Sequence, residues 1–164
     1  MCYMDQENKK SELILKNIIS YIKEANIIGC SEKEILEIEF FFNVKLPVLY
    51  KKFLSKMGHN AGDFLSGTDA FYNNIFSIRE WAKELLIECN EPFELKDNYF
   101  IFAIHQGYQF WFFDIEDDKY DPPIYYYFEG DKSYLKKYDR FSEFLLNSFN
   151  YIKKWGKNLK QTKL

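Results

Sequence analysis

The sequence is poor in the side chains that most often carry catalysis. It has only two histidines, His59 and His105, and three cysteines, none of which forms a CxxC pair. A nucleophilic triad needs a serine or cysteine beside a base and an orienting acid, and no GxSxG elbow is present. Glycine motifs of the GxxxxGK[ST] and GxGxxG types, which cradle phosphates, are absent too. We therefore expect no catalytic residues, no cofactor and no enzymatic activity.

Long apolar stretches are also missing. No segment reaches the roughly 18 uncharged apolar residues of a membrane span. The first ten residues, MCYMDQENKK, lack the apolar centre of a signal peptide. An odd number of cysteines is unusual for a secreted chain of this size. We therefore expect a cytoplasmic protein with reduced thiols that does not bind membranes.

Aromatic residues, by contrast, are abundant. They make up 20% of the 164 positions, within a hydrophobic share of 47%. A chain of this length and composition can bury one substantial core, which excludes general disorder. Aromatic side chains are also frequent in protein interfaces. We expect a single domain over residues 1–155, followed by a basic C-terminal tail over residues 156–164.

Charge is divided unevenly along the chain. Residues 61–131 carry 15 acidic and 4 basic side chains, whereas residues 132–164 carry 2 acidic and 9 basic ones, and the net charge is −3. An acidic surface repels nucleic acid and attracts a basic protein by electrostatic steering. Charges of this kind also form solvated faces that have no partner. Charge alone leaves both interpretations open.

Hydrophobic periodicity predicts four helices in the first 90 residues and one near the C-terminal end. Apolar residues recur at the three- and four-residue spacing of amphipathic helices in five segments. These segments are residues 11–26, 31–42, 47–57, 77–90 and 141–155. Two of them open with a Ser-x-x-Glu capping box, at Ser31 and at Ser77. Pro47 suits the first turn of its helix and Gly58 the end. Residues 59–76 lack a clear period, and we expect a long surface loop there with room for a short strand.

Three aromatic and β-branched runs predict antiparallel strands at residues 99–104, 109–115 and 124–130. Gly107 favours a tight turn between the first two. The polar stretch over residues 116–123 contains two prolines and is expected to be a loop. Consecutive strands flanked by helices define an α+β fold, here a meander of three or more strands packed against the helices.

Both faces of this predicted meander are aromatic. On the middle strand, Trp111 and Phe113 share one face and Phe112 lies on the other. A sheet that is covered by helices on one side only should be polar on the other. The second face is therefore either covered, by residues 59–76 and a terminal helix, or exposed as a groove for a partner. The sequence leaves both alternatives open.

Acidic residues cluster where the second predicted strand ends. They are Asp114, Glu116, Asp117, Asp118 and Asp121. A calcium-binding EF-hand loop needs glycine at its sixth position and glutamate at its twelfth, but Lys119 and Tyr125 stand there when counting starts at Asp114. We therefore expect no metal ligands. An RNA-stacking platform needs basic groups beside its aromatic rings. The neighbours here are acidic, so nucleic acid is not an expected partner.

Several segments together resemble the SUKH superfamily, which includes a fungal cell-wall synthesis regulator and many bacterial immunity proteins. The matching segments are Ile38-Glu39-Phe40, LPVLYKKFL (46–54), GHNAG (58–62), Phe113-Asp114, PIYYY (123–127) and FSEFL (141–145). The resemblance implies an α+β domain without catalytic residues that neutralises a polymorphic toxin, often a nuclease or deaminase, by binding it. One departure concerns the Gly-Gly pair that the family often has after the Leu-Pro helix. Ala61-Gly62 stands there, and a longer aromatic insert follows.

We therefore predict an immunity-type protein that binds a basic toxin domain, for instance a nuclease. The alternative is a regulatory scaffold or adaptor that recognises a cellular protein or peptide. The predicted partner-binding residues are the clustered acids and the aromatic residues on the strands beside them. They are Tyr108, Trp111, Asp114, Glu116, Asp117, Asp118, Asp121, Tyr125 and Tyr127. Aromatic anchors ringed by acids suit fast, steered association with a basic surface. The oligomeric state is left open.

Overall fold

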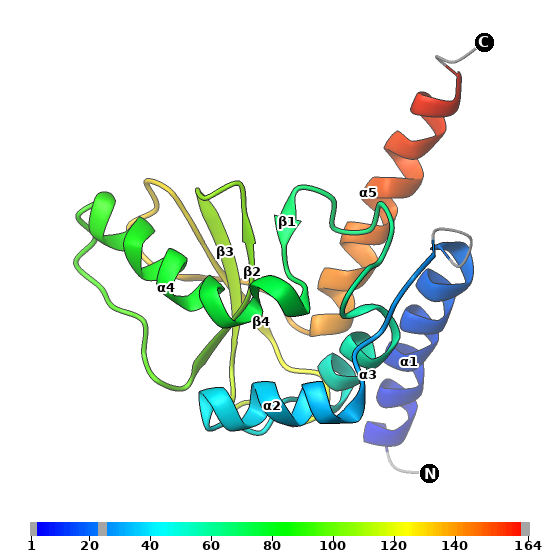
Figure 1. Ribbon diagram of the computed structural model, residues 1–164, viewed down its shortest axis with the longest axis horizontal. Coiled ribbons are helices and arrows are strands. Elements are labelled where there is room, and N and C mark those ends of the chain that lie inside the picture. The colour runs from blue at the N-terminus through cyan, green and yellow to red at the C-terminus, as the bar shows by residue number, and fades with distance from the viewer. Residues whose placement is uncertain (1–2, 23–25, 162–164) are drawn as a thin grey trace.

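The structure is a computed structural model that describes residues 3–22 and 26–161 (Figure 1). The helices are α1 (Tyr3–Ile22), α2 (Glu32–Phe42), α3 (Val48–Met57), α4 (Tyr72–Glu88) and α5 (Phe141–Gln161). The strands are β1 (Thr68–Asp69), β2 (Tyr99–His105), β3 (Gln109–Asp114), β4 (Ile124–Phe128) and β5 (Leu135–Tyr138). They form one antiparallel sheet in the order β1-β2-β3-β4-β5. The predicted α+β meander is therefore confirmed.

The start of α2 and the end of α3 follow the sequence signals. The backbone N–H of Glu34 donates to the Ser31 hydroxyl, and the Glu34 carboxylate accepts from the Ser31 backbone N–H at 2.8 Å. This is the predicted capping box, which pairs two backbone donors that the helix itself leaves free. At the end of α3, the Gly58 N–H donates to the Leu54 carbonyl at 2.8 Å.

The start of α4 differs from the prediction. The helix begins at Tyr72, after Phe71 in an extended conformation, so Ser77 lies inside it and the predicted capping box at Ser77 is wrong. The first turn is held instead by tertiary contacts, because the Tyr72 N–H donates to the Gly58 carbonyl at 2.8 Å. The predicted loop is shortened to residues 59–71 and contains β1.

Both chain ends are more helical than the periodicity suggested. α1 begins at Tyr3, well before residue 11, and α5 continues to Gln161, into the segment predicted to be a basic tail. Part of the predicted first helix, residues 23–25, and the last residues of the tail, 162–164, lie outside the described residues. The sequence reasoning also missed β5, whose residues are mostly exposed. No helix in the described part of the chain combines the length and apolar character that a membrane span requires.

One face of the sheet packs against α3 and α5. Tyr50 of α3 contacts the rings of Phe100 and Phe102, and Phe144 of α5 contacts Phe102 and Trp111. A register shift between Ile101 and Ala103 leaves Phe102 without a partner in β3, and it pairs Ala103 with Trp111, on the face that α5 covers. α1 packs outside this layer, against α3 and α5.

The opposite face is covered by α4 and by the chain around it (Figure 1). The rings of Phe110 and Phe112 lie against Tyr134, which follows β4, and both phenylalanines are buried. The aromatic character of both faces is therefore due mainly to core packing. α4, whose first turn belongs to the segment 59–76, and Tyr134 cover this face, while the C-terminal helix α5 covers the other.

Candidate protein-binding surface

The predicted partner-binding residues do not form one surface. Tyr108 precedes β3 and Asp114 ends it, and a strand rises about 3.3 Å per residue, so these two lie roughly 20 Å apart. Trp111 lies on the sheet face that contacts Phe144 of α5. Tyr125 pairs with Phe112 and therefore lies on the opposite face. Tyr108 and Trp111 are thus separated from the acidic residues.

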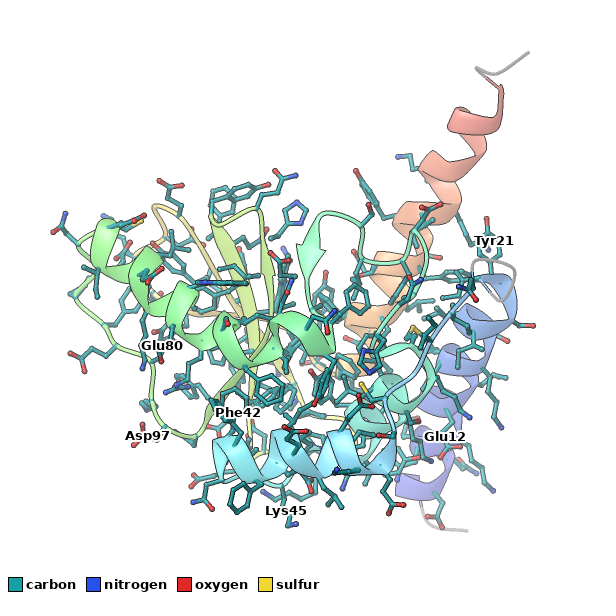
Figure 2. All side chains as sticks on the ribbon, viewed as in Figure 1. Glu12, Tyr21, Phe42, Lys45, Glu80 and Asp97 are labelled. Atoms are coloured by element: carbon teal, nitrogen blue, oxygen red, sulfur yellow. The ribbon has the colours of Figure 1, made fainter. Side chains whose placement is uncertain are left out.

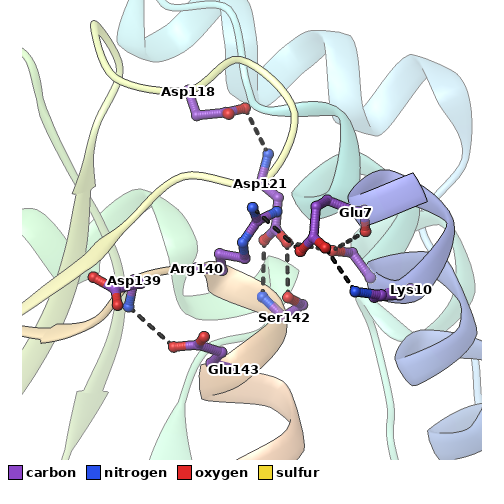
Figure 3. Close-up of polar contacts among 9 residues, drawn as sticks. Glu7, Lys10, Asp118, Asp121, Asp139, Arg140, Ser142 and Glu143 are labelled. Atoms are coloured by element: carbon purple, nitrogen blue, oxygen red, sulfur yellow. Dashed lines mark hydrogen bonds and ion pairs between the residues drawn. The ribbon is translucent and has the colours of Figure 1, made fainter. Parts of the chain in front are cut away.

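Two residues of the predicted set lie in the interior. Asp121 is 2% exposed, and its carboxylate accepts hydrogen bonds from the Ser142 N–H at 2.9 Å, the Ser142 hydroxyl at 2.7 Å and the Ser11 hydroxyl at 2.5 Å (Figure 3). Tyr127 is fully buried and donates its hydroxyl to Glu91 at 2.7 Å, and burial raises its pKa. Neither side chain reaches the surface, so the prediction that they contact a partner directly is wrong.

The segment between β3 and β4, residues 115–123, carries the remaining acids except Asp114, which precedes it. We call this segment the acidic loop. Asp114 accepts from the backbone N–H of Glu116 at 2.9 Å and from the Asn98 side chain at 2.7 Å. Asp118 accepts from the Tyr120 backbone N–H at 2.6 Å. These bonds shape the loop, while Glu116 and Asp118 remain exposed.

Asp117 and Tyr125 are half-buried and paired. The Tyr125 hydroxyl donates to the Asp117 carboxylate at 3.3 Å. Burial and the negative charge of Asp117 raise the pKa of Tyr125, so the phenol keeps the proton that it donates. Five of the predicted residues therefore lie at one end of the sheet. They are Asp114, Glu116, Asp117, Asp118 and Tyr125.

The sequence reasoning missed the outward face of α2. Leu36 is 53% exposed, Phe40 is 89% exposed and Phe41 is 61% exposed. Leu36 and Phe40 lie one turn apart and form an apolar stripe that faces away from the core. Phe41 is also exposed, although its ring contacts those of Phe42 and Phe76. The sequence does contain a sign of this exposed face, because α2 has more apolar residues than one helix face can bury.

This apolar stripe and the acidic loop line the same groove, which we call the α2 groove. Its volume is about 580 Å³. The lining residues are Leu36, Glu39, Phe40, Asn43, Val44, Lys45, Ile115, Glu116 and Lys119. The backbone N–H groups of Val48 and Leu49 donate to the carbonyls of Lys119 and Tyr120, both at 2.9 Å, and fix the acidic loop beside α3. The groove thus combines exposed apolar side chains with Glu116 of the acidic loop, and Lys45 and Lys119 also line it.

Glu39 stabilises the turn on one side of the groove. It is 5% exposed, and its carboxylate accepts from the Leu46 N–H at 2.8 Å and pairs with Lys51 at 3.4 Å and Lys45 at 3.5 Å. A buried carboxylate is tolerated when donors satisfy it in this way. Lys45 follows the end of α2 and its side chain is 85% exposed, while Phe42 packs toward Phe76 of α4 (Figure 2). The groove therefore has a rigid base.

A separate polar cluster lies at the other end of α2. Cys30 is buried, and its thiol lies close to the carboxylate of Glu34 and the ring of His59. Burial, and then the charge of Glu34, raise the pKa of Cys30 to about 12. Nε2 of His59 lies 2.9 Å from the Glu34 carboxylate, and the His59 ring packs against Tyr72. No role was assigned to His59 from the sequence alone.

The fold and the groove define a class: an α+β domain with an open groove that exposes apolar side chains beside Glu116, an arrangement that suits the binding of another protein. The sequence profile of the SMI1 / KNR4 family (SUKH-1) matches residues 29–147, from just before α2 into α5, and the chain belongs to this family. No curated protein matches the chain. The family is generally one of non-enzymatic immunity or regulatory proteins that bind protein partners.

Proposed function

We propose that this chain is an immunity-type protein of the bacterial cytoplasm, which binds a toxin domain through the α2 groove and thereby neutralises it. The observation that carries the proposal is the exposure of Phe40. Among the large apolar side chains of the described residues, it has the highest exposed fraction, 89%, and it lies in one groove with the acidic loop. Family membership supports a protein partner.

The apolar stripe supplies the affinity in this proposal. Burial of a phenylalanine or leucine side chain contributes about 1.5–3 kcal/mol, and a few such anchors usually dominate an interface. Phe40 and Leu36 lie on a helix whose other face is buried in the core, so little flexibility is lost when a partner covers them. Glu39 holds the following turn in place.

The acidic loop supplies the attraction to a basic partner. Glu116 is exposed and lines the groove, and Asp117 and the exposed Asp118 follow it in the acidic loop. Nucleases bind phosphates and therefore carry basic surfaces, which an acidic edge attracts and can occupy. Tyr108 and Trp111 belong to a different part of the surface, and their contact with a partner stays a prediction.

The test compares two exposed apolar residues on different helices. The variant Phe40→Ala is expected to raise the Kd for the cognate toxin roughly 10- to 100-fold, the equivalent of burying one large side chain. Ile87→Ala is the matched control, because Ile87 is 74% exposed on α4, away from the groove. It should leave the Kd unchanged. The toxin is a domain encoded beside this gene or recovered with the chain from native cells.

A toxin assay separates the immunity role from a regulatory one. Wild-type chain and Ile87→Ala are expected to block toxin activity at equimolar ratio, and Phe40→Ala to block it only in excess. If the native partner instead has no toxic activity and Phe40→Ala still weakens its binding, the groove binds a cellular protein and the immunity proposal is wrong. Equal binding by Phe40→Ala and wild type contradicts the placement of the surface.

A further inference from the structure

Three side chains of metal-binding types meet beside the start of α2, outside the α2 groove. Cys30 precedes α2, Glu34 lies in its first turn and His59 follows α3. The sulfur of Cys30, a carboxylate oxygen of Glu34 and a ring nitrogen of His59 all lie within 4.8 Å of one another. We propose that Cys30, Glu34 and His59 bind one divalent cation of the zinc class, with water as the fourth ligand.

The distance between the His59 and Glu34 ligand atoms suits such an ion. Zinc bonds of about 2.3 Å to sulfur and about 2.0–2.1 Å to nitrogen or oxygen imply ligand atoms roughly 3.3–3.6 Å apart in a tetrahedral site. Nε2 of His59 and Oε1 of Glu34 are 2.9 Å apart, joined by a hydrogen bond. An entering cation must widen this pair only slightly, and it replaces one hydrogen bond with two coordination bonds.

The backbone holds two of the three ligands in place before any ion binds. The Cys30 N–H donates to the Leu54 carbonyl and the His59 N–H to the Ile28 carbonyl, both at 2.9 Å. Gly58 makes the close approach possible, because a Cβ at this position would lie 2.4 Å from the Cys30 sulfur. The thiol and the imidazole are therefore fixed by segments that are far apart in the sequence.

The capping box orients the third ligand. Oε2 of Glu34 accepts from the Ser31 N–H at 2.8 Å and from the Ser31 hydroxyl at 2.9 Å. This leaves Oε1 directed toward His59, as its 2.9 Å contact shows. Outer hydrogen bonds of this kind set the direction of metal ligands and raise the affinity of a site. Ser31, the N-cap of α2, thus also orients the Glu34 carboxylate as a metal ligand.

The chemistry of the donors selects the ion. Thiolate and imidazole favour zinc, whereas calcium and magnesium require several oxygen ligands. Cys30 gives its thiol proton to solvent when its sulfur coordinates, and no electron is transferred. The start of α2 carries about half a positive charge, which opposes a cation. A thiolate and a carboxylate together supply two negative charges and outweigh it. The side chains of Glu34 and His59 are 30% and 25% exposed, so the ion and a water can enter.

The test titrates the reduced, metal-free and untagged chain with Zn²⁺ in competition with a chromophoric chelator. One Zn²⁺ per chain is expected, and Cys30→Ser and His59→Gln should each bind at least tenfold more weakly. The chain provides matched controls in its other described cysteine and histidine, because Cys89→Ser and His105→Gln should bind Zn²⁺ like the wild type. Co²⁺ in place of Zn²⁺ should give a thiolate-to-metal charge-transfer band that Cys30→Ser lacks.

A third variant keeps the test decisive if Cys30→Ser does not fold. Glutamine also completes a capping box, so Glu34→Gln should retain α2 while it loses an anionic ligand and at least tenfold in Zn²⁺ affinity. The proposal is overturned if wild-type chain does not bind Zn²⁺, if the ligand variants bind it like wild type, or if Cys89→Ser and His105→Gln weaken it equally.

Discussion

Two acids of one short segment, Glu116 and Asp121, have opposite roles. Glu116 is exposed at the edge of the α2 groove, where its side chain is free to meet a partner. Asp121 is buried, and its carboxylate joins the acidic loop to Ser11 of α1 and Ser142 of α5 (Figure 3). Two acidic residues five positions apart thus differ: Glu116 is exposed, and we propose that it contacts a partner, whereas Asp121 is buried and holds parts of the fold together.

The difference lies in partners that are distant in the sequence. Asp121 accepts hydrogen bonds from Ser11, which lies 110 positions away in the sequence, and from Ser142, which lies 21 positions away. These bonds offset the cost of removing its carboxylate from water. For Glu116, by contrast, the backbone N–H donates to the carboxylate of its near neighbour Asp114. A run of acids in a sequence is therefore not one surface. An acid becomes buried where the fold provides hydrogen-bond donors for it, and the other acids of the run stay at the surface.

The largest expected effect is the loss of stability in Asp121→Ala. The change removes the buried acceptor of the Ser142 N–H and hydroxyl and leaves the Ser11 hydroxyl only the Glu7 carbonyl at 3.1 Å. The loss costs about 3 kcal/mol in the free energy of unfolding and lowers Tm by roughly 6–12 °C. Thermal and denaturant unfolding measure it. Glu116→Ala is the control and should change the free energy of unfolding by at most about 0.5 kcal/mol. Equal losses in the two variants would remove the distinction between these acids.

A second effect concerns association with the toxin. Glu116→Lys reverses a charge at the groove edge and should slow association several-fold at low salt, with the difference fading as ionic strength rises. Lys119→Glu changes the opposite charge in the same groove and should speed association. Stopped-flow rates at several salt concentrations measure both. An on-rate that neither variant changes would show that the acidic loop does not steer the partner.

The smallest expected effect is on the stability of the fold and concerns Glu12 of α1. Glu12 is half-buried, so its exposure lies between that of Glu116 and that of Asp121. The Lys52 ammonium donates to Glu12 at 2.5 Å and lowers its pKa from 4.5, and the Tyr120 hydroxyl adds to this shift. A lowered pKa in the folded state contributes stability above pH 4.5 that is lost as the pH falls through the folded value. The contribution is at most about 1 kcal/mol, since the pair is partly solvated.

Unfolding curves between pH 3 and pH 7 test this contribution. Glu12→Gln should be less stable than wild type at neutral pH, and the gap should narrow as the pH falls below the unfolded pKa. Glu80→Gln is a suitable control, because Glu80 pairs with Lys83 on the exposed side of α4. A gap that stays constant with pH would show that the Glu12 charge does not contribute to stability.

Local signals were enough to predict much of the fold. The capping box at Ser31, the stop at Gly58 and the aromatic strands gave the right elements, because each depends on neighbours within a few positions. The true start of α4 depends on the contact of Tyr72 with Gly58, which no local pattern contains. β5 was missed because its residues are mostly exposed and lack a clear alternation.

The candidate surface was harder to predict than the fold. The acidic loop was found from composition, but Phe40 faces solvent only because Ile35 and Ile38 occupy the inner face of α2. Deciding between these competing stripes requires the tertiary structure. The neighbourhood of Cys30 and His59 likewise arises from contacts across the fold, so their spacing along the chain gave no sign of it.

The most direct measurement of the central claim is amide hydrogen exchange of the whole chain, alone and bound to its toxin. The account predicts new protection in α2 and in the acidic loop, residues 115–123, and unchanged exchange at the turn over residues 105–109 that carries Tyr108. Protection confined to that turn, with α2 and the acidic loop unaffected, would contradict the claim that the partner binds in the α2 groove.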